Sequence, residues 1–197
     1  QSKHSSSTHS MKPSRSIITI AASLFFTMLF SACSLGGISY KTEKLEKLGL
    51  KVDKPARWTA TKTQSDEKYV DYVIDIPQKS DTKPTVNGHI AINVVKPLPG
   101  ETVTIQDEIE GLKKFFAARV QELKTLEETD TTLLGQPAKR IILEFRNDED
   151  KTIVEKVLIT LTVKDSKAYT LILDEDLQDF ETYLPVYTKM AESMQLL

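Results

Sequence analysis

The stretch KRIILEFRNDEDKTIVEKVLITLTVKDSKAYTLIL, residues 139–173, decides the fold. Three runs within it alternate between apolar and other side chains: 139–145, 152–163 and 167–173. Alternation with a period of two is typical of a β-strand with one buried face. Short connections, NDEDK and Asp165-Ser166, separate the runs. The stretch therefore predicts a three-stranded antiparallel meander, with the middle run as the longest strand of the protein. The side chains expected to face inward are Ile141, Leu143, Phe145, Val157, Ile159, Leu161, Val163, Tyr169, Leu171 and Leu173.

The period changes upstream of this meander. Residues 104–124 place apolar side chains at steps of three and four, which predicts an amphipathic helix. The stripe consists of Ile105, Ile109, Leu112, Phe116, Val120 and Leu123. Thr104 precedes Asp107 by three residues, a spacing typical of a helix N-cap, and acidic residues follow where the helix dipole favours them. A strand over 124–134 and a turn at Gly135-Gln136-Pro137 then lead into the meander.

The N-terminal half of the domain predicts three more strands. Residues 50–58 form a short run that Pro55 ends, with Trp58 as an aromatic anchor beyond the turn. Residues 69–76 and 89–95 alternate, and QKSDTKPTVNG at 78–88 is a polar connection between them. The expected core positions of these two strands are Val70, Tyr72, Ile74, Ile76, Ile90, Ile92 and Val94. The charged segment KTEKLEKL at 41–48 is expected to form one helical turn.

A second amphipathic helix ends the chain. Its apolar face is predicted to consist of Leu177, Phe180, Leu184, Tyr187, Ala191 and Met194. Pro185 lies inside this pattern, so either the helix starts at Leu184, with the proline in its first turn, or the helix is kinked at the proline. Two helices against about six antiparallel strands predict an α+β layered domain.

The order of these elements resembles the PsbP-like family, which includes DcrB-like bacterial lipoproteins. The resemblance rests on a Pro-x-x-Trp turn (PARW, 55–58), a strand entering a Gly-Gln-Pro turn, the meander, and the terminal segment FETYLPVYTKMAESM at 180–194. It covers about residues 46–197 and implies an antiparallel sheet between helices, an α/β/α sandwich. It also implies roles in binding, assembly or accessory support, and no shared reaction or ligand residues.

Cys33 is the only cysteine, and it follows an apolar run. Lys12 and Arg15 precede fourteen uncharged residues, 17–30, in the order typical of a secretory signal, and the run is shorter than a transmembrane helix. The segment LFSACS at 29–34 resembles a bacterial lipobox, although Phe30 occupies the position where leucine is commonest. Cys33 is therefore predicted to carry a lipid and to become the mature N-terminus. A buried structural thiol and a catalytic nucleophile are the alternatives, whereas a disulfide within the chain is impossible.

This reading divides the chain into four segments: an extension (1–10), a lipoprotein signal peptide (11–32), a flexible tether (33–45) and a PsbP-like domain (46–197). The net charge is −2, and residues 1–32 contain three basic and no acidic residues, so the remainder carries −5. Such a surface offers nucleic acid no electrostatic attraction. A three-chain lipid anchor would hold the domain stably at a membrane. In a cell with two membranes, Ser34 in place of aspartate favours the outer membrane, on its periplasmic face.

Candidate chemistry is sparse. His89 is expected on the outward side of its strand beside Ala91 and Asn93, but a lone histidine does not make a metal site. The acidic tip 148–150 lacks the ligand spacing of an EF-hand, so a solvated turn is expected. The acidic residues Asp174, Glu175, Asp176 and Asp179 are interpreted as serving the N-terminal dipole of the last helix. We therefore predict no catalytic residue, cofactor or metal.

Two functions remain open. The first, which the sequence favours, is a lipid-anchored envelope protein that binds a partner protein and assists the assembly or stability of an envelope complex; it predicts an exposed apolar patch. The second is a lipoprotein that binds a small molecule in a mostly apolar pocket between sheet and helix. A hydrolase with a site assembled from scattered residues is a distant third.

Overall fold

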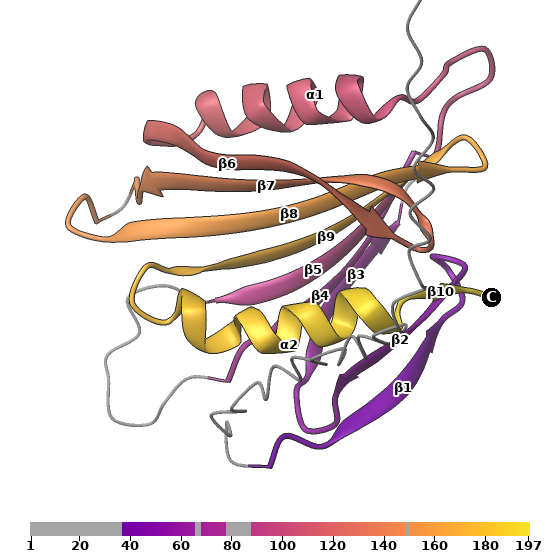
Figure 1. Cartoon of the computed structure of the whole chain (residues 1–197), viewed down its shortest axis with the longest axis horizontal. Coiled ribbons are helices and arrows are strands. Elements are labelled where there is room, and N and C mark those ends of the chain that lie inside the picture. The colour runs from indigo at the N-terminus through magenta and orange to yellow at the C-terminus, as the bar shows by residue number, and fades with distance from the viewer. Residues whose placement is uncertain (1–36, 66–67, 78–87, 149) are drawn as a thin grey trace, which may run out of the picture. The chain divides into compact units, whose positions relative to one another are not determined.

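Seven antiparallel strands form the main sheet, in the order β3-β4-β5-β9-β8-β7-β6 (Figure 1). The computed structural model describes residues 37–65, 68–77, 88–148 and 150–197. The strands of the main sheet are β3 (Ala60–Ser65), β4 (Tyr69–Asp75), β5 (His89–Val95), β6 (Gln121–Leu133), β7 (Gln136–Arg146), β8 (Val154–Lys164) and β9 (Lys167–Asp176). A second sheet, in the order β1-β2-β10, contains β1 (Tyr40–Leu45), β2 (Leu50–Pro55) and β10 (Gln195–Leu196). The helices are α1 (Ile105–Ala117) and α2 (Phe180–Ser193). The predicted α+β class, with helices on the faces of an antiparallel sheet, is confirmed.

The meander β7-β8-β9 is confirmed, and β6 extends it by one strand. Asp165 and Ser166 have φ values of 50° and 58°, and Leu134 and Gly135 have 54° and 68°. Two successive positive φ values define the tight turn whose twist matches a hairpin. The second turn therefore lies one residue earlier than predicted, and Gln136 already begins β7. The longest strand is β6, with 13 residues, and not β8, with 11.

Helix α1 covers one face of the sheet across β6 to β8 (Figure 1). Thr104 caps it as predicted, because its hydroxyl accepts the Asp107 N–H at 3.1 Å. Ile109 packs against three fully buried residues of β8, namely Val157, Ile159 and Leu161. The predicted end of the helix at residue 124 is wrong, since β6 begins at Gln121.

The error has a physical cause. Val120 and Leu123 follow α1 and pack against the same hydrophobic cluster from the connection and from β6. Apolar spacing therefore continues although the backbone has left the helix, and Glu122 adopts a φ of 53° there. A periodicity argument detects the shared core but not the change of backbone conformation.

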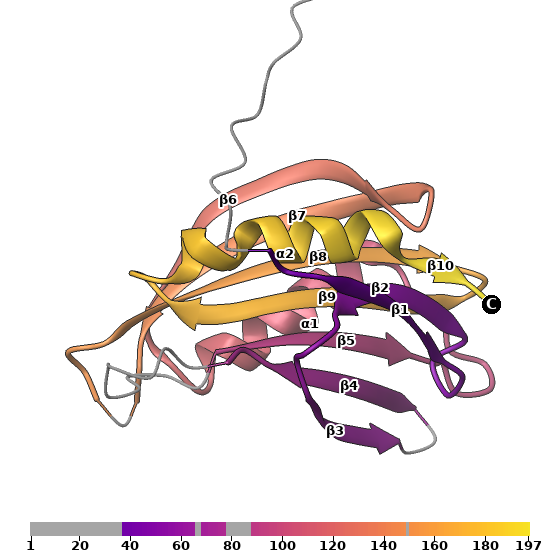
Figure 2. The same cartoon turned by 90° about the horizontal axis from the view of Figure 1, so that it is seen from below.

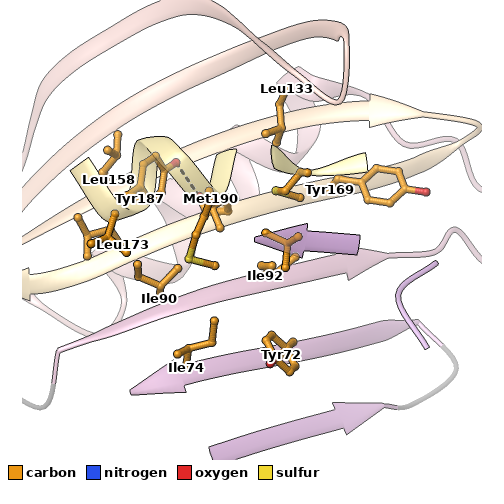
Figure 3. Close-up of a cluster of buried hydrophobic side chains, with 14 of the residues drawn as sticks. Tyr72, Ile74, Ile90, Ile92, Leu133, Leu158, Tyr169, Leu173, Tyr187 and Met190 are labelled. Carbon is orange, nitrogen blue, oxygen red and sulfur yellow. Dashed lines mark hydrogen bonds between the residues drawn. The ribbon is translucent and has the colours of Figure 1, made fainter. Parts of the chain in front are cut away.

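Helix α2 lies on the opposite face of the main sheet and packs chiefly against β9 and β2 (Figure 2). It begins at Phe180, so Pro185 lies inside it, and a start at Leu184 is excluded. Leu177 is 41% exposed and does not belong to the buried face. The buried side chains of the helix are Phe180, Tyr183, Val186, Tyr187 and Met190. Figure 3 shows Tyr187 and Met190 within the cluster that this face forms with the sheet.

The second sheet contradicts two predictions made from the sequence, the helical turn at 41–48 and the extent of the flexible tether. Residues 41–48 do not form a helical turn: Tyr40–Leu45 is β1, and it pairs with β2 in antiparallel register. The last residues of the predicted tether are therefore part of the folded domain. Within β1, Leu45 is buried against the core whereas Lys41 and Lys44 are exposed.

A polar network joins the second sheet to the main sheet. Lys54 is 3% exposed, and its Nζ donates to the Trp58 carbonyl at 2.5 Å and lies 3.6 Å from Glu43. Glu43 also accepts the Tyr72 hydroxyl of β4 at 2.8 Å. Trp58 is the predicted aromatic anchor, since it is buried edge-on against Tyr183 of α2. A buried ammonium requires such partners to offset its desolvation.

Two further points complete the fold. The sequence does not predict the edge strand β3. The core positions predicted for residues 69–76 and 89–95 are all buried. Within the described residues, neither helix has the length and apolar character that a membrane crossing needs.

Candidate ligand-binding groove

A groove with a volume of about 330 Å³ lies between α2 and the hairpin end of β6 and β7, and β8 contributes to its floor. Its apolar lining consists of Leu133, Leu134, Leu158, Ala191 and Met194. Its polar lining consists of Thr131, Thr132, Arg140, Thr160, Tyr187, Thr188 and Glu192. Figure 3 shows Leu133, Leu158 and Tyr187 on the α2 side of the sheet. This is the position that a pocket between sheet and helix would occupy, although its walls are more polar than predicted.

The register of the strands brings the polar side chains together. Arg140 of β7 pairs with Thr160 of β8 and with Thr129 of β6. Thr160 in turn pairs with Leu171, which is buried in the α2 cluster. Because side chains of directly paired residues point to one face, Arg140 and Thr160 share the face that α2 covers. Helix α2 packs chiefly on β9 and β2, so the ends of β6 and β7 remain open to the groove.

Tyr187 closes the inner wall. It is 4% exposed, and its hydroxyl donates to Thr160 Oγ1 at 2.6 Å and to the Leu171 carbonyl at 3.1 Å. A hydroxyl has one hydrogen, so it makes these two bonds in alternation. Burial raises the pKa of Tyr187 well above its ordinary value, and the hydrogen bond with Thr160 and the nearby Arg140 only partly oppose this shift. Tyr187 is therefore a neutral donor and not a catalytic base.

Arg140 is the charged group of the groove. Its Nε is buried and has no hydrogen-bond partner among the described residues. The nearest carboxylate oxygen, Oε1 of Glu127, lies 3.8 Å away, which is an ion-pair contact but too long for a hydrogen bond. The arginine side chain as a whole is 35% exposed and lines the groove. A buried donor without an acceptor costs about 1–3 kcal/mol, so this N–H would gain from a group that supplies an acceptor.

The groove contains no recognisable catalytic set. Its ionisable side chains are Arg140, Tyr187 and Glu192, and its hydroxyls belong to threonine and tyrosine. A nucleophile needs an adjacent base, and no histidine or cysteine lines this groove. No group of three His, Cys, Asp or Glu side chains suited to a metal ion occurs among the described residues. The arrangement can bind a molecule by hydrogen bonds and apolar contact.

Two neighbouring carboxyl groups, of the half-buried Asp174 and the buried Glu155, lie on the other face of the sheet. Glu155 of β8 is 6% exposed, and the Asn147 amide donates to its carboxylate. Burial, together with the charge and hydrogen bond of Glu155, raises the pKa of Asp174 to about 8. Oδ1 of Asp174 has no hydrogen-bond partner within the described part of the chain. The interpretation of the acidic run as serving the helix dipole is therefore wrong for Asp174, and also for Glu175, which is a buried residue of β9.

The other sequence candidates remain apart from the groove. His89 lies at the start of β5, half-buried, paired with Asp75 and Asp174. Asp148 and Asp150 are exposed at the β7–β8 tip, and Asp150 Oδ1 accepts the Thr152 hydroxyl at 2.7 Å. Cys33, the signal segment, most of the 78–88 connection and Glu149 fall outside the described residues.

Sequence reasoning missed the groove residues. Arg140 stands in an alternating strand, where a cation ordinarily indicates a solvated face. Thr160 has the character of an ordinary strand residue, and the helical pattern places Tyr187 in the core without indicating a partner for its hydroxyl. The one available signal is the alternation itself, which places Arg140 on the same side of its strand as Ala138 and Ile142.

Comparisons with solved structures agree on one architecture. CyanoP, the PsbP of the cyanobacterium Synechocystis sp. PCC 6803, superposes with a TM-score of 0.57 at 15% identity, over 86% of this chain and 99% of its own. The chain has the PsbP-like fold. The Ran-binding protein Mog1p of Saccharomyces cerevisiae gives a TM-score of 0.54 at 9% identity, over 81% and 96% of the two chains. The PsbP-like resemblance predicted from the sequence is thus confirmed for the fold.

A third PsbP-like neighbour is LpqN of Mycobacterium tuberculosis, described as involved in cell envelope biogenesis. Its TM-score is 0.53 at 10% identity, over 80% of this chain and 90% of its own. No protein-family profile and no curated protein sequence matches the chain. At such identities the shared fold carries no activity from one protein to the other.

Proposed function

We propose that this chain is a non-enzymatic binding protein of the bacterial cell envelope, held at a membrane by a lipid on Cys33, and that its groove takes a small molecule. The observation that carries the proposal is the buried Arg140 Nε without an acceptor, in a groove that also contains threonine hydroxyls. Pockets for small molecules combine apolar walls with a few convergent polar groups, and about 330 Å³ is at the lower end of their range.

The anchor is supported by the sequence. A basic start, a run of fourteen uncharged residues and small residues before Cys33 follow the order of a lipoprotein signal. A lipid on Cys33 would hold the protein at a membrane, the outer membrane if the cell has two.

The test of the anchor is intact-mass measurement on protein purified from its native membrane, beside a Cys33→Ala variant. The proposal requires a chain that begins at Cys33 and carries acyl mass, and a variant without that mass. An unmodified chain in the soluble fraction would exclude the anchor.

The test of the groove is native mass spectrometry of the same preparation. We expect a bound small molecule in the wild-type protein that is lost in Thr188→Trp, because Thr188 lines the groove from the exposed side of α2. Lys189→Trp is the matched control, since Lys189 is the next exposed residue and does not line this groove. Equal occupancy in the two variants would rule out the groove as the binding site.

A partner protein is the second candidate, and it is the function that the sequence favours. Phe115 of α1 and Leu126 of β6 are 49% and 48% exposed, and the two elements are neighbours joined by the Lys113–Glu128 ion pair at 2.6 Å. The description of LpqN in envelope biogenesis and of Mog1p in Ran binding also favours partner binding by this fold. A photo-crosslinking residue at position 115 in intact membranes would capture such a partner. Reproducible crosslinks there, with none from position 150, would support this role.

A further inference from the structure

We infer that the molecule bound in the groove is a small aliphatic carboxylic acid, whose carboxylate pairs with Arg140. This inference rests on the proposed function and deepens it by naming the class of ligand. Four features carry it: the geometry of Arg140, the hydroxyl beside it, the apolar wall and the position of Glu127.

The first feature is the unsatisfied guanidinium. Arg140 Nε is buried and has no hydrogen-bond partner among the described residues, while Glu127 Oε1 stays at 3.8 Å. A guanidinium presents its N–H groups as a planar fork that matches two carboxylate oxygens. Hydrogen bonds between ions are shorter and about twice as strong as neutral ones, so a carboxylate satisfies this donor better than an amide or hydroxyl oxygen does.

The second feature is Thr160, which is paired with Arg140 across β7 and β8. Tyr187 donates to Thr160 Oγ1 at 2.6 Å, and its raised pKa keeps it protonated as a donor. Tyr187 alternates between Thr160 and the Leu171 carbonyl, and while it donates to Thr160 the hydroxyl hydrogen of Thr160 is available to an acceptor in the groove. Arg140 and Thr160 therefore place two donors side by side, as the two oxygens of one carboxylate require.

The third feature is the apolar wall. Leu134 and Ala191 line the groove and are partly exposed, with the buried Leu133, Leu158 and Met194 beneath them. A short hydrocarbon chain attached to the carboxylate would contact them, which would remove part of its apolar surface from water. A volume of about 330 Å³ accommodates a small acid.

The fourth feature is competition for the arginine. Glu127 is 40% exposed, and its long contact with Arg140 is of the weakly stabilising, solvent-screened kind. A bound carboxylate would replace Glu127 as the partner of Arg140. Removing the charge of Glu127 should therefore strengthen binding of the acid. Replacing the guanidinium of Arg140 by the single ammonium of lysine should weaken it.

The experiment is a titration of the full lipidated protein in detergent micelles, with Met194 carrying a ¹³C-labelled methyl group as the NMR reporter in the groove. Sodium pentanoate is the probe, and pentanamide is its uncharged counterpart of similar size. We expect saturable shifts of the Met194 signal with pentanoate, and at least about tenfold weaker binding of pentanamide. Arg140→Lys should weaken pentanoate about tenfold, and Glu127→Gln should strengthen it several-fold.

The results separate the inference from the proposed function. Three results would each overturn the inference that the ligand is a carboxylic acid. They are equal shifts with pentanoate and pentanamide, weaker binding of pentanoate by Glu127→Gln, and no saturable binding of pentanoate. If native mass spectrometry then still finds a molecule that Thr188→Trp removes, the groove remains a binding site for another class of ligand. If it finds none, the proposed function fails as well.

Discussion

Replacing Asp174 by asparagine should remove a large part of the pH dependence of stability. Burial and Glu155 raise the pKa of Asp174 from 3.8 to about 8. Between these values the folded protein keeps a proton that the unfolded chain has lost, so raising the pH destabilises the fold. The free energy of unfolding falls by about 1.4 kcal/mol for each pH unit, or about 3 kcal/mol from pH 5 to pH 7. The stabilisation by the neutral carboxyl is fully present below pH 4 and is lost progressively up to about pH 8.

For a domain of this size, about 3 kcal/mol corresponds to a decrease of about 6–12 °C in melting temperature. The Asp174→Asn variant has no carboxyl to ionise at this position, while the new amide can still donate to Glu155 in place of the protonated carboxyl. We therefore expect the variant to lose less stability than the wild type between pH 5 and pH 7, and to be the more stable protein at pH 8.

Urea denaturation at both pH values measures the difference directly. Asp150→Asn is the control, because hydrogen bonds to Thr152 lower the pKa of Asp150 and its removal should leave the slope between pH 5 and pH 7 unchanged. Parallel pH profiles for the wild type and Asp174→Asn would refute the assignment of a raised pKa to this carboxyl.

Three further substitutions test the packing. Tyr187→Phe should cost about 1–2 kcal/mol in urea denaturation, because it removes the hydroxyl bonded to Thr160; an unchanged midpoint would show that this bond contributes nothing. Gly88→Ala should cost about 1–3 kcal/mol in the same assay, since a Cβ there would collide with the Glu175 carboxylate, and a variant as stable as the wild type would contradict that close approach. Thr104→Ala should cost about 1 kcal/mol through loss of the α1 cap, whereas Thr104→Ser should retain most of the stability; similar losses in both would point away from capping.

The sequence predicted most of the architecture because the fold depends on local periodicity. Alternation identified the buried faces of β4, β5, β7, β8 and β9, and the spacing of Ile105 to Phe116 identified α1. The errors arose where two elements share one core. Val120 and Leu123 extend the pattern of α1 into β6, and the leucines of 41–48 suit a helical turn as well as a strand that pairs with β2.

The groove was less predictable for a different physical reason. The roles of Arg140, Thr160 and Tyr187 depend on contacts between three elements, and none of these contacts is encoded in the spacing within one element. The same holds for Asp174, which an acidic run ahead of a helix suggested to be a dipole partner. Its environment depends on the pairing of β9 with β8, which brings it close to Glu155.

The groove forms because helix α2 does not cover the whole face of the main sheet on which it lies. Strand β6 has 13 residues, and its hairpin with β7 forms one edge of the main sheet, while α2 packs chiefly on β9 and β2. The face of β6 and β7 beside α2 is thus left without a helix, and its side chains must be compatible with water. Threonines and a charged residue meet this requirement, and one of them, Arg140, has a buried donor without an acceptor among the described residues. Unsatisfied buried donors destabilise a fold, and the ligand that we propose would supply the missing acceptor.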